Sequence, residues 1–206
     1  MPGQEGEQTM PYLQTVPPER AAGEVKALYD KDLAAQGYVA NYTRAFSGRP
    51  DVLQGWQALK DAITSGMDPR LYELATVAAA TAIRSSYCSL VHGHILAAGY
   101  YPAEKVVSIA ANEAAEALNA ADAAVVRFAQ KVALEAEKIT QQDVDELRGL
   151  GFSDADVFNV IAAAAARCFF SKVLDATGTQ PDGVLREMSD QLRSALTVGR
   201  EIASPQ

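Results

Sequence analysis

The sequence predicts an all-α protein. Apolar residues recur at the three- and four-residue spacing of helices over most of the chain, and alanine dominates these stretches. No run alternates apolar and polar residues with the period of two that marks a β-strand. The 206 residues, 49% of them hydrophobic, suffice for one sizeable core but not for two comfortable domains.

Helix start and stop signals divide the chain. Asp68-Pro69 is typical of an N-cap followed by proline at the first helical position, Ser153 is a second N-cap, and Gly37 and Gly178 are stop signals. The predicted helices are residues 19–35, 42–46, 51–64, 69–84, 87–98, 102–111, 119 or 122 to 138, 141–148, 153–176 and 182–198.

No internal repeat or low-complexity linker separates these helices. We therefore expect a disordered N-terminal lead at residues 1–10, one helical domain at residues 11–180, and a C-terminal amphipathic helix and tail at residues 181–206.

Composition excludes several classes of protein. A net charge of −8 argues against binding to nucleic acid or to an anionic membrane surface. The first ten residues lack the basic and apolar regions of a secretory signal, and no stretch approaches ~18 unbroken apolar residues. Two cysteines cannot form a disulfide framework, so we expect reduced thiols in a cytoplasmic protein.

Both histidines and one of the two cysteines fall within seven residues, Cys88-Ser-Leu-Val-His92-Gly-His94. Cysteine and histidine are suited to nucleophilic and proton-transfer chemistry near neutral pH. Cys88 and His92 are four residues apart, so on a helix they share one face. A thiol beside an imidazole is an arrangement that activates a nucleophile.

The Ser85-Ser86 break predicts a central helical hairpin that brings Glu73 to this pair. In one continuous helix Glu73 and Cys88 would lie ~22 Å apart. If the chain turns back at Ser85, His92 falls between Cys88 and Glu73, and the glutamate can orient the imidazole directly or through one water.

The same break puts Ser85 or Ser86 at a helix N-cap and Cys88 in the first turn, where the helix dipole favours a thiolate. Ser85 lies three residues before Cys88, close enough to hydrogen bond its sulfur. Cys88, His92, Glu73 and Ser85 are therefore the candidate site residues.

Each of these residues also has a structural interpretation. A free cysteine is usually buried, a single histidine is often a satisfied interior group, and Glu73 alone would be an exposed helix glutamate. His94 lies ~200° around the helix from His92, which disfavours a metal site built from this cluster. Cys168 is predicted to be core, unless the fold brings it to Cys88 as a resolving thiol.

The pattern of Glu73, eleven residues, Ser85-Ser-Tyr-Cys88, three residues and His92 resembles the signature of the AhpD-like alkylhydroperoxidase and carboxymuconolactone decarboxylase superfamily. The opening Pro-Tyr-Leu…Gly-Glu-Val-Lys-Ala-Leu-Tyr and the later Phe128-Ala-Gln-Lys look like its peroxidase-related subgroup. The resemblance covers roughly residues 10–180.

This resemblance implies an AhpD-like helical fold, a homo-oligomer (a trimer or a dimer of trimers) and a thiol peroxidase without metal, haem or flavin. Cys88 would be the peroxidatic thiol, His92 its proton partner and Glu73 the relay carboxylate, with a small peroxide and a thiol reductant as partners. The family's first cysteine is Ser85 here, so Cys88 needs Cys168, a partner subunit or an external thiol to resolve its sulfenic acid. A histidine common just before the second cysteine is Tyr87 here.

Two alternatives to a peroxidase remain. A lactone-processing enzyme of the same fold would perform acid–base chemistry on an anionic organic acid and would need a cationic group, for which Arg84 and Arg167 are the candidates. A non-enzymatic oligomer would use the thiol to sense oxidants, or would bind a small ligand.

Overall fold

A computed structural model describes residues 11–204, and within them the chain forms helices, turns and loops but no strand. The predicted all-α fold is therefore confirmed, whereas the expected lead at residues 1–10 lies outside the described residues. The α-helices are α1 (Gly23–Gln36), α2 (Asn41–Ala45), α3 (Pro50–Ser65), α4 (Pro69–Ala82), α5 (Ser86–Gly99), α6 (Ala103–Ala110), α7 (Ala114–Ala117), α8 (Ala120–Glu135), α9 (Gln141–Gly149), α10 (Asp154–Ala176) and α11 (Asp190–Leu196). Short 3-10 turns lie at Pro18–Arg20, Ala136–Lys138 and Gly183–Glu187.

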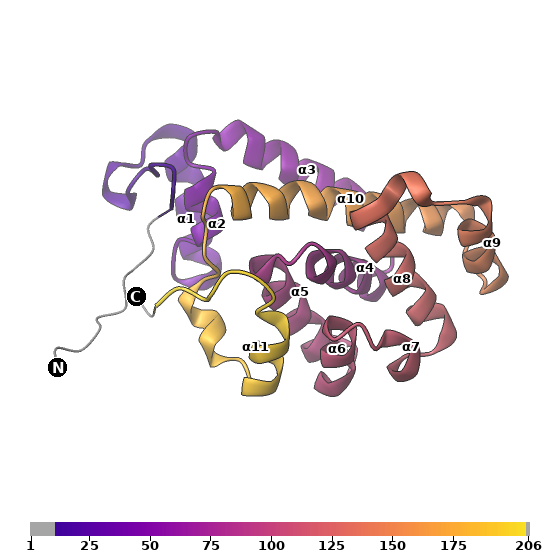
Figure 1. The fold of residues 1–206 in the computed structure, drawn as a ribbon. Helices are drawn as coiled ribbons and strands as arrows, with labels where there is room; N and C mark the ends of the chain where they lie inside the picture. The colour runs from indigo at the N-terminus through magenta and orange to yellow at the C-terminus, as the bar shows by residue number, and fades with distance from the viewer. Residues whose placement is uncertain (1–10, 205–206) are drawn as a thin grey trace.

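Helices α4 and α5 form the predicted central hairpin (Figure 1). Asp68 caps α4, since its carboxylate accepts a hydrogen bond from the Leu71 N–H at 2.9 Å. The chain reverses after α4 through Arg84, whose φ of 59° is left-handed, and α5 begins at Ser86. Almost all of α4 is buried, because α8 and α10 pack on it as well as α5.

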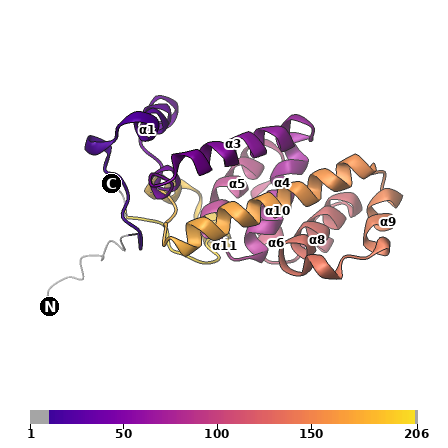
Figure 2. The same cartoon turned by 90° about the horizontal axis from the view of Figure 1, so that it is seen from above.

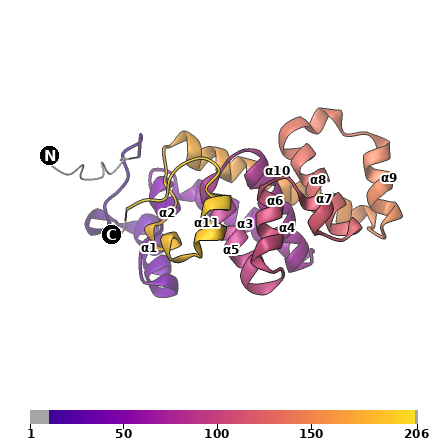
Figure 3. The same cartoon turned by 60° about the horizontal axis from the view of Figure 1, so that its bottom comes forward.

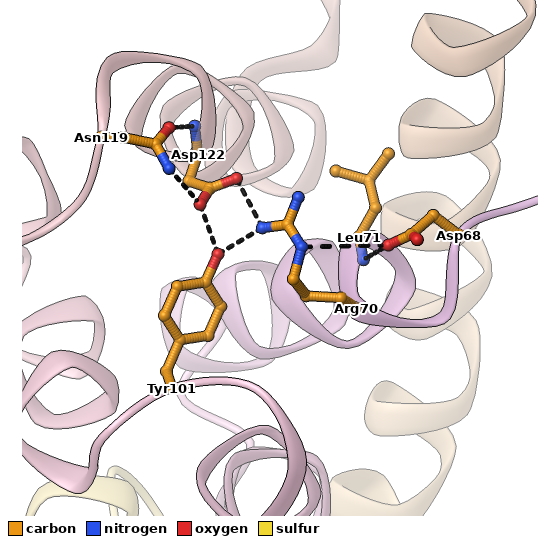
Figure 4. Close-up of polar contacts among 6 residues, drawn as sticks. All are labelled: Asp68, Arg70, Leu71, Tyr101, Asn119 and Asp122. Carbon is orange, nitrogen blue, oxygen red and sulfur yellow. Dashed lines mark hydrogen bonds and ion pairs between the residues drawn. The ribbon is translucent and has the colours of Figure 1, made fainter.

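A partly buried polar cluster fixes the end of α4 that is remote from this turn (Figure 4). Asp122, near the start of α8, accepts hydrogen bonds from Arg70 at 2.7 Å, from Asn119 at 2.7 Å and from the Tyr101 hydroxyl. Burial alone would raise the pKa of Asp122, but these donors outweigh it and lower the pKa. The cluster ties α8 and the α5–α6 connection to α4 around an ionised carboxylate.

Helix α10 crosses the top of the hairpin beside α3 (Figures 1 and 2). Ser153 begins it with a capping box that includes Asp156. By length and hydropathy α10 is also the one helix of the described residues that meets the criterion for a membrane span. Its packing against α3, α4, α5 and α8 is that of a core helix.

The C-terminal segment differs from the predicted helix at residues 182–198. A 3-10 turn, Gly183–Glu187, comes first, and α11 starts only at Asp190 with Ser189 as its cap. The reason is that the Asp182 carboxylate is used in a tertiary contact, where it accepts hydrogen bonds from the Asn41 N–H at 2.8 Å and from the Tyr87 hydroxyl. Helix α11 then lies against α5 and α6 (Figure 3).

The first predicted helix also begins later than expected. Pro17 and Pro18 lead into a 3-10 turn instead, and the α-helix starts at Gly23 and ends at Gly37 with a left-handed φ of 82°. Helix α7 was not predicted, because its four residues are too few to produce a helical period.

Candidate active site

Cys88 lies in the first turn of α5, at the floor of a cavity of about 420 Å³. Its side chain is almost wholly buried, with 2% of the residue exposed. The free N–H groups and dipole of the α5 N-terminus favour a thiolate at this position.

His92 and Glu73 form the contact that the hairpin predicts. His92 Nδ1 lies 2.6 Å from Glu73 Oε2, so the imidazole donates directly to the carboxylate without a bridging water. His92 lines the cavity with Cys88, one turn further along α5, but no hydrogen bond joins the two side chains. The pair therefore presents the remaining ring nitrogen, Nε2, for proton transfer.

The electrostatic surroundings keep His92 neutral. Burial is the largest influence on its pKa and lowers it, and the positive charge of Arg167 lowers it further. The hydrogen bond to Glu73 opposes both effects without reversing them. A neutral imidazole at pH 7 can accept a proton, as a general base must.

Arg167 is the site residue whose position the sequence predicted least well. The sequence indicates it only as a candidate cationic group, yet it is 3% exposed and comes from α10. Its Nη1 donates to Cys88 Sγ at 3.4 Å and its Nη2 donates to the Tyr72 hydroxyl at 3.2 Å. The available signal was an arginine in an alanine-rich, otherwise apolar stretch of helix, where burial without a partner is costly.

No carboxylate of the described residues forms an ion pair with Arg167. The guanidinium instead lies 5.4 Å from the Trp56 ring centre and 5.6 Å from that of Phe170. Burial would lower its pKa, but Cys88 and Tyr72 raise it, so the group stays charged. Cys88 is the side chain next to it that can supply a compensating negative charge.

The structure does not show the expected hydrogen bond from Ser85 to the sulfur. Ser85 is fully buried and precedes α5, but its Oγ does not hydrogen bond Cys88 and it does not line the cavity. Its backbone carbonyl accepts the Ser89 N–H at 3.0 Å, so Ser85 helps to begin the helix. The contact with Cys88 that was predicted for Ser85 is made by Arg167.

Three other candidates named from the sequence differ in where they lie relative to the cavity. Arg84 is exposed in the hairpin turn, whereas His94 lines the outer part of the cavity. Cys168 follows Arg167 in α10, does not line the cavity, and has its pKa raised, chiefly by burial. Residues 11–204 contain no group of three or more potential metal ligands.

Tyr87 stands where the resembled signature commonly has a histidine, and its hydroxyl is occupied by structural hydrogen bonds. Its hydroxyl donates to Asp182 and accepts the Tyr42 N–H at 3.3 Å. Asp182 and Leu185 bring the C-terminal segment into the cavity wall. Residues far apart in the chain thus meet on either side of Cys88.

Comparison with known proteins gives a family match over part of the chain and a shared fold over most of it. The model of the carboxymuconolactone decarboxylase family matches residues 50–131, which include Glu73, Cys88 and His92. An uncharacterized peroxidase-related protein from Ralstonia eutropha JMP134, an alkylhydroperoxidase AhpD core, is 21% identical, covers 92% of this chain and 98% of its own, and has a TM-score of 0.75. The corresponding values for an uncharacterized peroxidase-related protein from Silicibacter sp. TM1040 are 19%, 90%, 99% and 0.76.

A third solved structure is a cysteine-to-alanine variant of the debrominase Bmp8 in complex with 2,3,4-tribromopyrrole. It is 17% identical, covers 88% of this chain and 94% of its own, and has a TM-score of 0.66. At these identities the structural matches establish a shared fold. No curated protein sequence matches the chain.

Proposed function

We propose that the chain is a member of the AhpD-like carboxymuconolactone decarboxylase superfamily and that it is a thiol peroxidase, which reduces organic hydroperoxides or hydrogen peroxide through Cys88. The observation that carries the proposal is the surroundings of the Cys88 thiol, which lines a cavity. The Arg167 guanidinium donates a hydrogen bond to its sulfur, and His92, paired with Glu73, lines the same cavity. No metal or organic cofactor takes part in the proposed reaction.

In the first step the Cys88 thiolate attacks the terminal peroxide oxygen. The sulfur–oxygen bond forms as the oxygen–oxygen bond breaks, and the leaving oxygen departs with the bonding electron pair and is protonated to an alcohol or to water. Arg167 stabilises the thiolate, and His92, oriented by Glu73, takes the thiol proton and delivers it to the leaving oxygen through Nε2. The product at Cys88 is a sulfenic acid.

An external thiol then completes the cycle. Its sulfur displaces hydroxide from the sulfenic acid, water leaves, and a mixed disulfide remains; a second thiol releases Cys88 as a thiol and carries away the disulfide. Cys168 is a poor resolving group, because burial raises its pKa and it does not line the cavity. Ser85 cannot form a disulfide in place of the family's first cysteine.

The test is mass spectrometry of Cys88 after brief exposure to peroxide with a sulfenic-acid trap. We expect rapid trapping at Cys88 that is much slower in His92→Ala, while Cys168 reacts slowly in both proteins. Equal trapping in the variant would contradict the mechanism, and no trapping in either protein would exclude the peroxidase. Oxidation that no thiol reverses would instead favour the oxidant sensor.

Acid–base chemistry on an anionic organic acid is the second candidate function. It is favoured by the buried Arg167, because that enzyme needs a cationic group in its site, whereas Arg84 lies outside. Turnover of a lactone acid that survives in Cys88→Ser would support it, since this chemistry needs no thiol. A halogenated heteroaromatic compound belongs in the same substrate panel, because one protein of this fold is a debrominase.

A further inference from the structure

The cavity over Cys88 is far larger than hydrogen peroxide requires. Its volume of about 420 Å³ lies in the range of sites that hold organic ligands of some size. A water molecule occupies roughly 30 Å³ in the liquid. The volume therefore favours an organic substrate over the smallest peroxide.

The deep walls of the cavity are aromatic. Trp56 stacks on Phe170 with 4.8 Å between ring centres, and Tyr42 meets Phe170 edge-on at 5.7 Å. Tyr38 and Tyr87 add two more rings, and aliphatic side chains complete the lining. Such a surface suits an aromatic or comparably bulky apolar body.

The chain as a whole is acidic, but cations outnumber carboxylates among the charged side chains that line the cavity. The sequence has 26 acidic and 18 basic residues, yet the charged side chains of the cavity are Arg167, Lys60 and Asp182, two cations and one carboxyl. Asp182 already accepts hydrogen bonds from the Asn41 N–H and the Tyr87 hydroxyl, and burial raises its pKa. The charged side chains of the lining therefore favour an anionic ligand over a cationic one.

Lys60 is the lining cation that an anionic group on a ligand can reach most easily. Arg167 is buried at the floor and engaged by Cys88, whereas the Lys60 side chain is 41% exposed at the cavity edge. Lys60 forms an ion pair with neighbouring Asp61 at 3.2 Å, and an exposed pair of this kind contributes only about 0–1 kcal/mol. Its ammonium group can exchange that partner for an anionic group on a bound ligand.

We propose that the cavity takes an organic hydroperoxide with an aromatic body and a carboxylate remote from the peroxide group. The peroxide end reaches Cys88, the ring lies among the aromatic walls, and Lys60 holds the carboxylate at the edge. The proposal rests on the proposed peroxidase function, and it adds a substrate class and a specificity-determining residue.

Binding is tested apart from thiol chemistry. Trp56 is the chain's single tryptophan and lines the cavity, so its fluorescence reports occupancy. The probes are 4-(2-hydroxypropan-2-yl)benzoate and its uncharged parent, 2-phenylpropan-2-ol, which carry no peroxide. We expect the carboxylate to bind about three- to tenfold more tightly, with the preference lost in Lys60→Gln and at high salt, and kept in Lys31→Gln, an exposed lysine outside this cavity.

Reaction is tested with the matched hydroperoxides. Single-turnover oxidation of Cys88 is compared for cumene hydroperoxide, its para-carboxylated form and hydrogen peroxide. We expect the carboxylated compound to react fastest in the wild type and to lose its lead over cumene hydroperoxide in Lys60→Gln.

Equal binding of the two alcohols, a preference that survives Lys60→Gln, or a fastest reaction with hydrogen peroxide would each overturn the proposed substrate class. If the carboxylated alcohol binds as expected but no peroxide oxidises Cys88, the peroxidase function fails and the hydroperoxide assignment fails with it, while the carboxylate site stands.

Discussion

Arg167 is the cation in contact with the Cys88 sulfur, at 3.4 Å. A charge-assisted hydrogen bond contributes about 1.5–3 kcal/mol, so losing this contact should slow a reaction that depends on it by roughly tenfold or more. We expect Arg167→Gln to slow the reaction of Cys88 with iodoacetamide at pH 7 by about tenfold, and Arg167→Lys to keep part of the rate. The measurement is pseudo-first-order alkylation followed by mass spectrometry.

Arg127→Gln is the matched control, because Arg127 is exposed and pairs with Glu146 far from the cavity. Circular dichroism checks that the variants fold. An Arg167→Gln protein that is folded and alkylates at the wild-type rate would show that the 3.4 Å contact does not activate the thiol.

The titration of His92 follows from its burial and from two neighbours, Arg167 and Glu73. Burial and Arg167 lower its pKa, so we expect a midpoint below the ordinary histidine value of 6.5, and a neutral base at pH 7. Glu73 raises the pKa, so Glu73→Gln should lower the midpoint further, and Arg167→Gln should raise it. NMR of the imidazole protons measures both shifts, and His94→Gln assigns the two histidines. A midpoint that rises in Glu73→Gln, or that falls in Arg167→Gln, would refute this account.

At the scale of elements, the C-terminal segment holds the helix that carries Cys88. Gly199 N–H donates to Ser86 Oγ at 2.7 Å, and the Ser89 hydroxyl donates to the Leu196 carbonyl. A Cβ at Gly199 would lie 2.2 Å from the Arg84 carbonyl oxygen, where only backbone movement can relieve the clash. The close approach of the segment to α5 therefore depends on glycine at this position.

We expect Gly199→Ala to destabilise the fold by about 1–3 kcal/mol and to speed amide exchange in α11 and in the first turn of α5. Hydrogen exchange and thermal denaturation measure the two effects. Gly149→Ala is the control, because a Cβ there meets no atom within 4 Å. Unchanged exchange in Gly199→Ala would show that the segment does not support the site helix.

Local signals explain which elements could be predicted. Asp68-Pro69 and Ser85-Ser86 mark the starts of α4 and α5, so the hairpin could be predicted, and with it a position of Glu73 near His92. The direct 2.6 Å contact depends on how closely the two helices pack, which the spacing does not give. Arg167 could not be placed, because its contact with Cys88 spans 79 residues and depends on how α10 crosses the hairpin. Asp182 is a residue type that favours an N-cap, but its carboxylate accepts hydrogen bonds from Tyr87 and Asn41 instead. The helix predicted to begin there therefore starts later.

At the scale of the whole molecule, the outer face of α10 carries an apolar stripe. Phe158 is 67% exposed and Phe169 is 45% exposed. They are eleven residues apart, so they lie on one side of the helix, and the partly or fully exposed Ala162 and Ala165 fall between them on the same side. Leu59 of the neighbouring α3 is also exposed. Large exposed apolar side chains gathered on one face are typical of a protein interface.

We expect this stripe to form the contact between copies of the chain in a homo-oligomer, a trimer or a dimer of trimers. Light scattering after size exclusion should give a multiple of the 21.9 kDa chain mass at micromolar concentration. Phe158→Glu should lower that mass, because it places a charge in an apolar contact that must be desolvated. Leu134→Glu, on α8 and 60% exposed, should leave the mass unchanged. A wild-type monomer, or equal loss of mass in both variants, would mean that the α10 stripe does not join subunits.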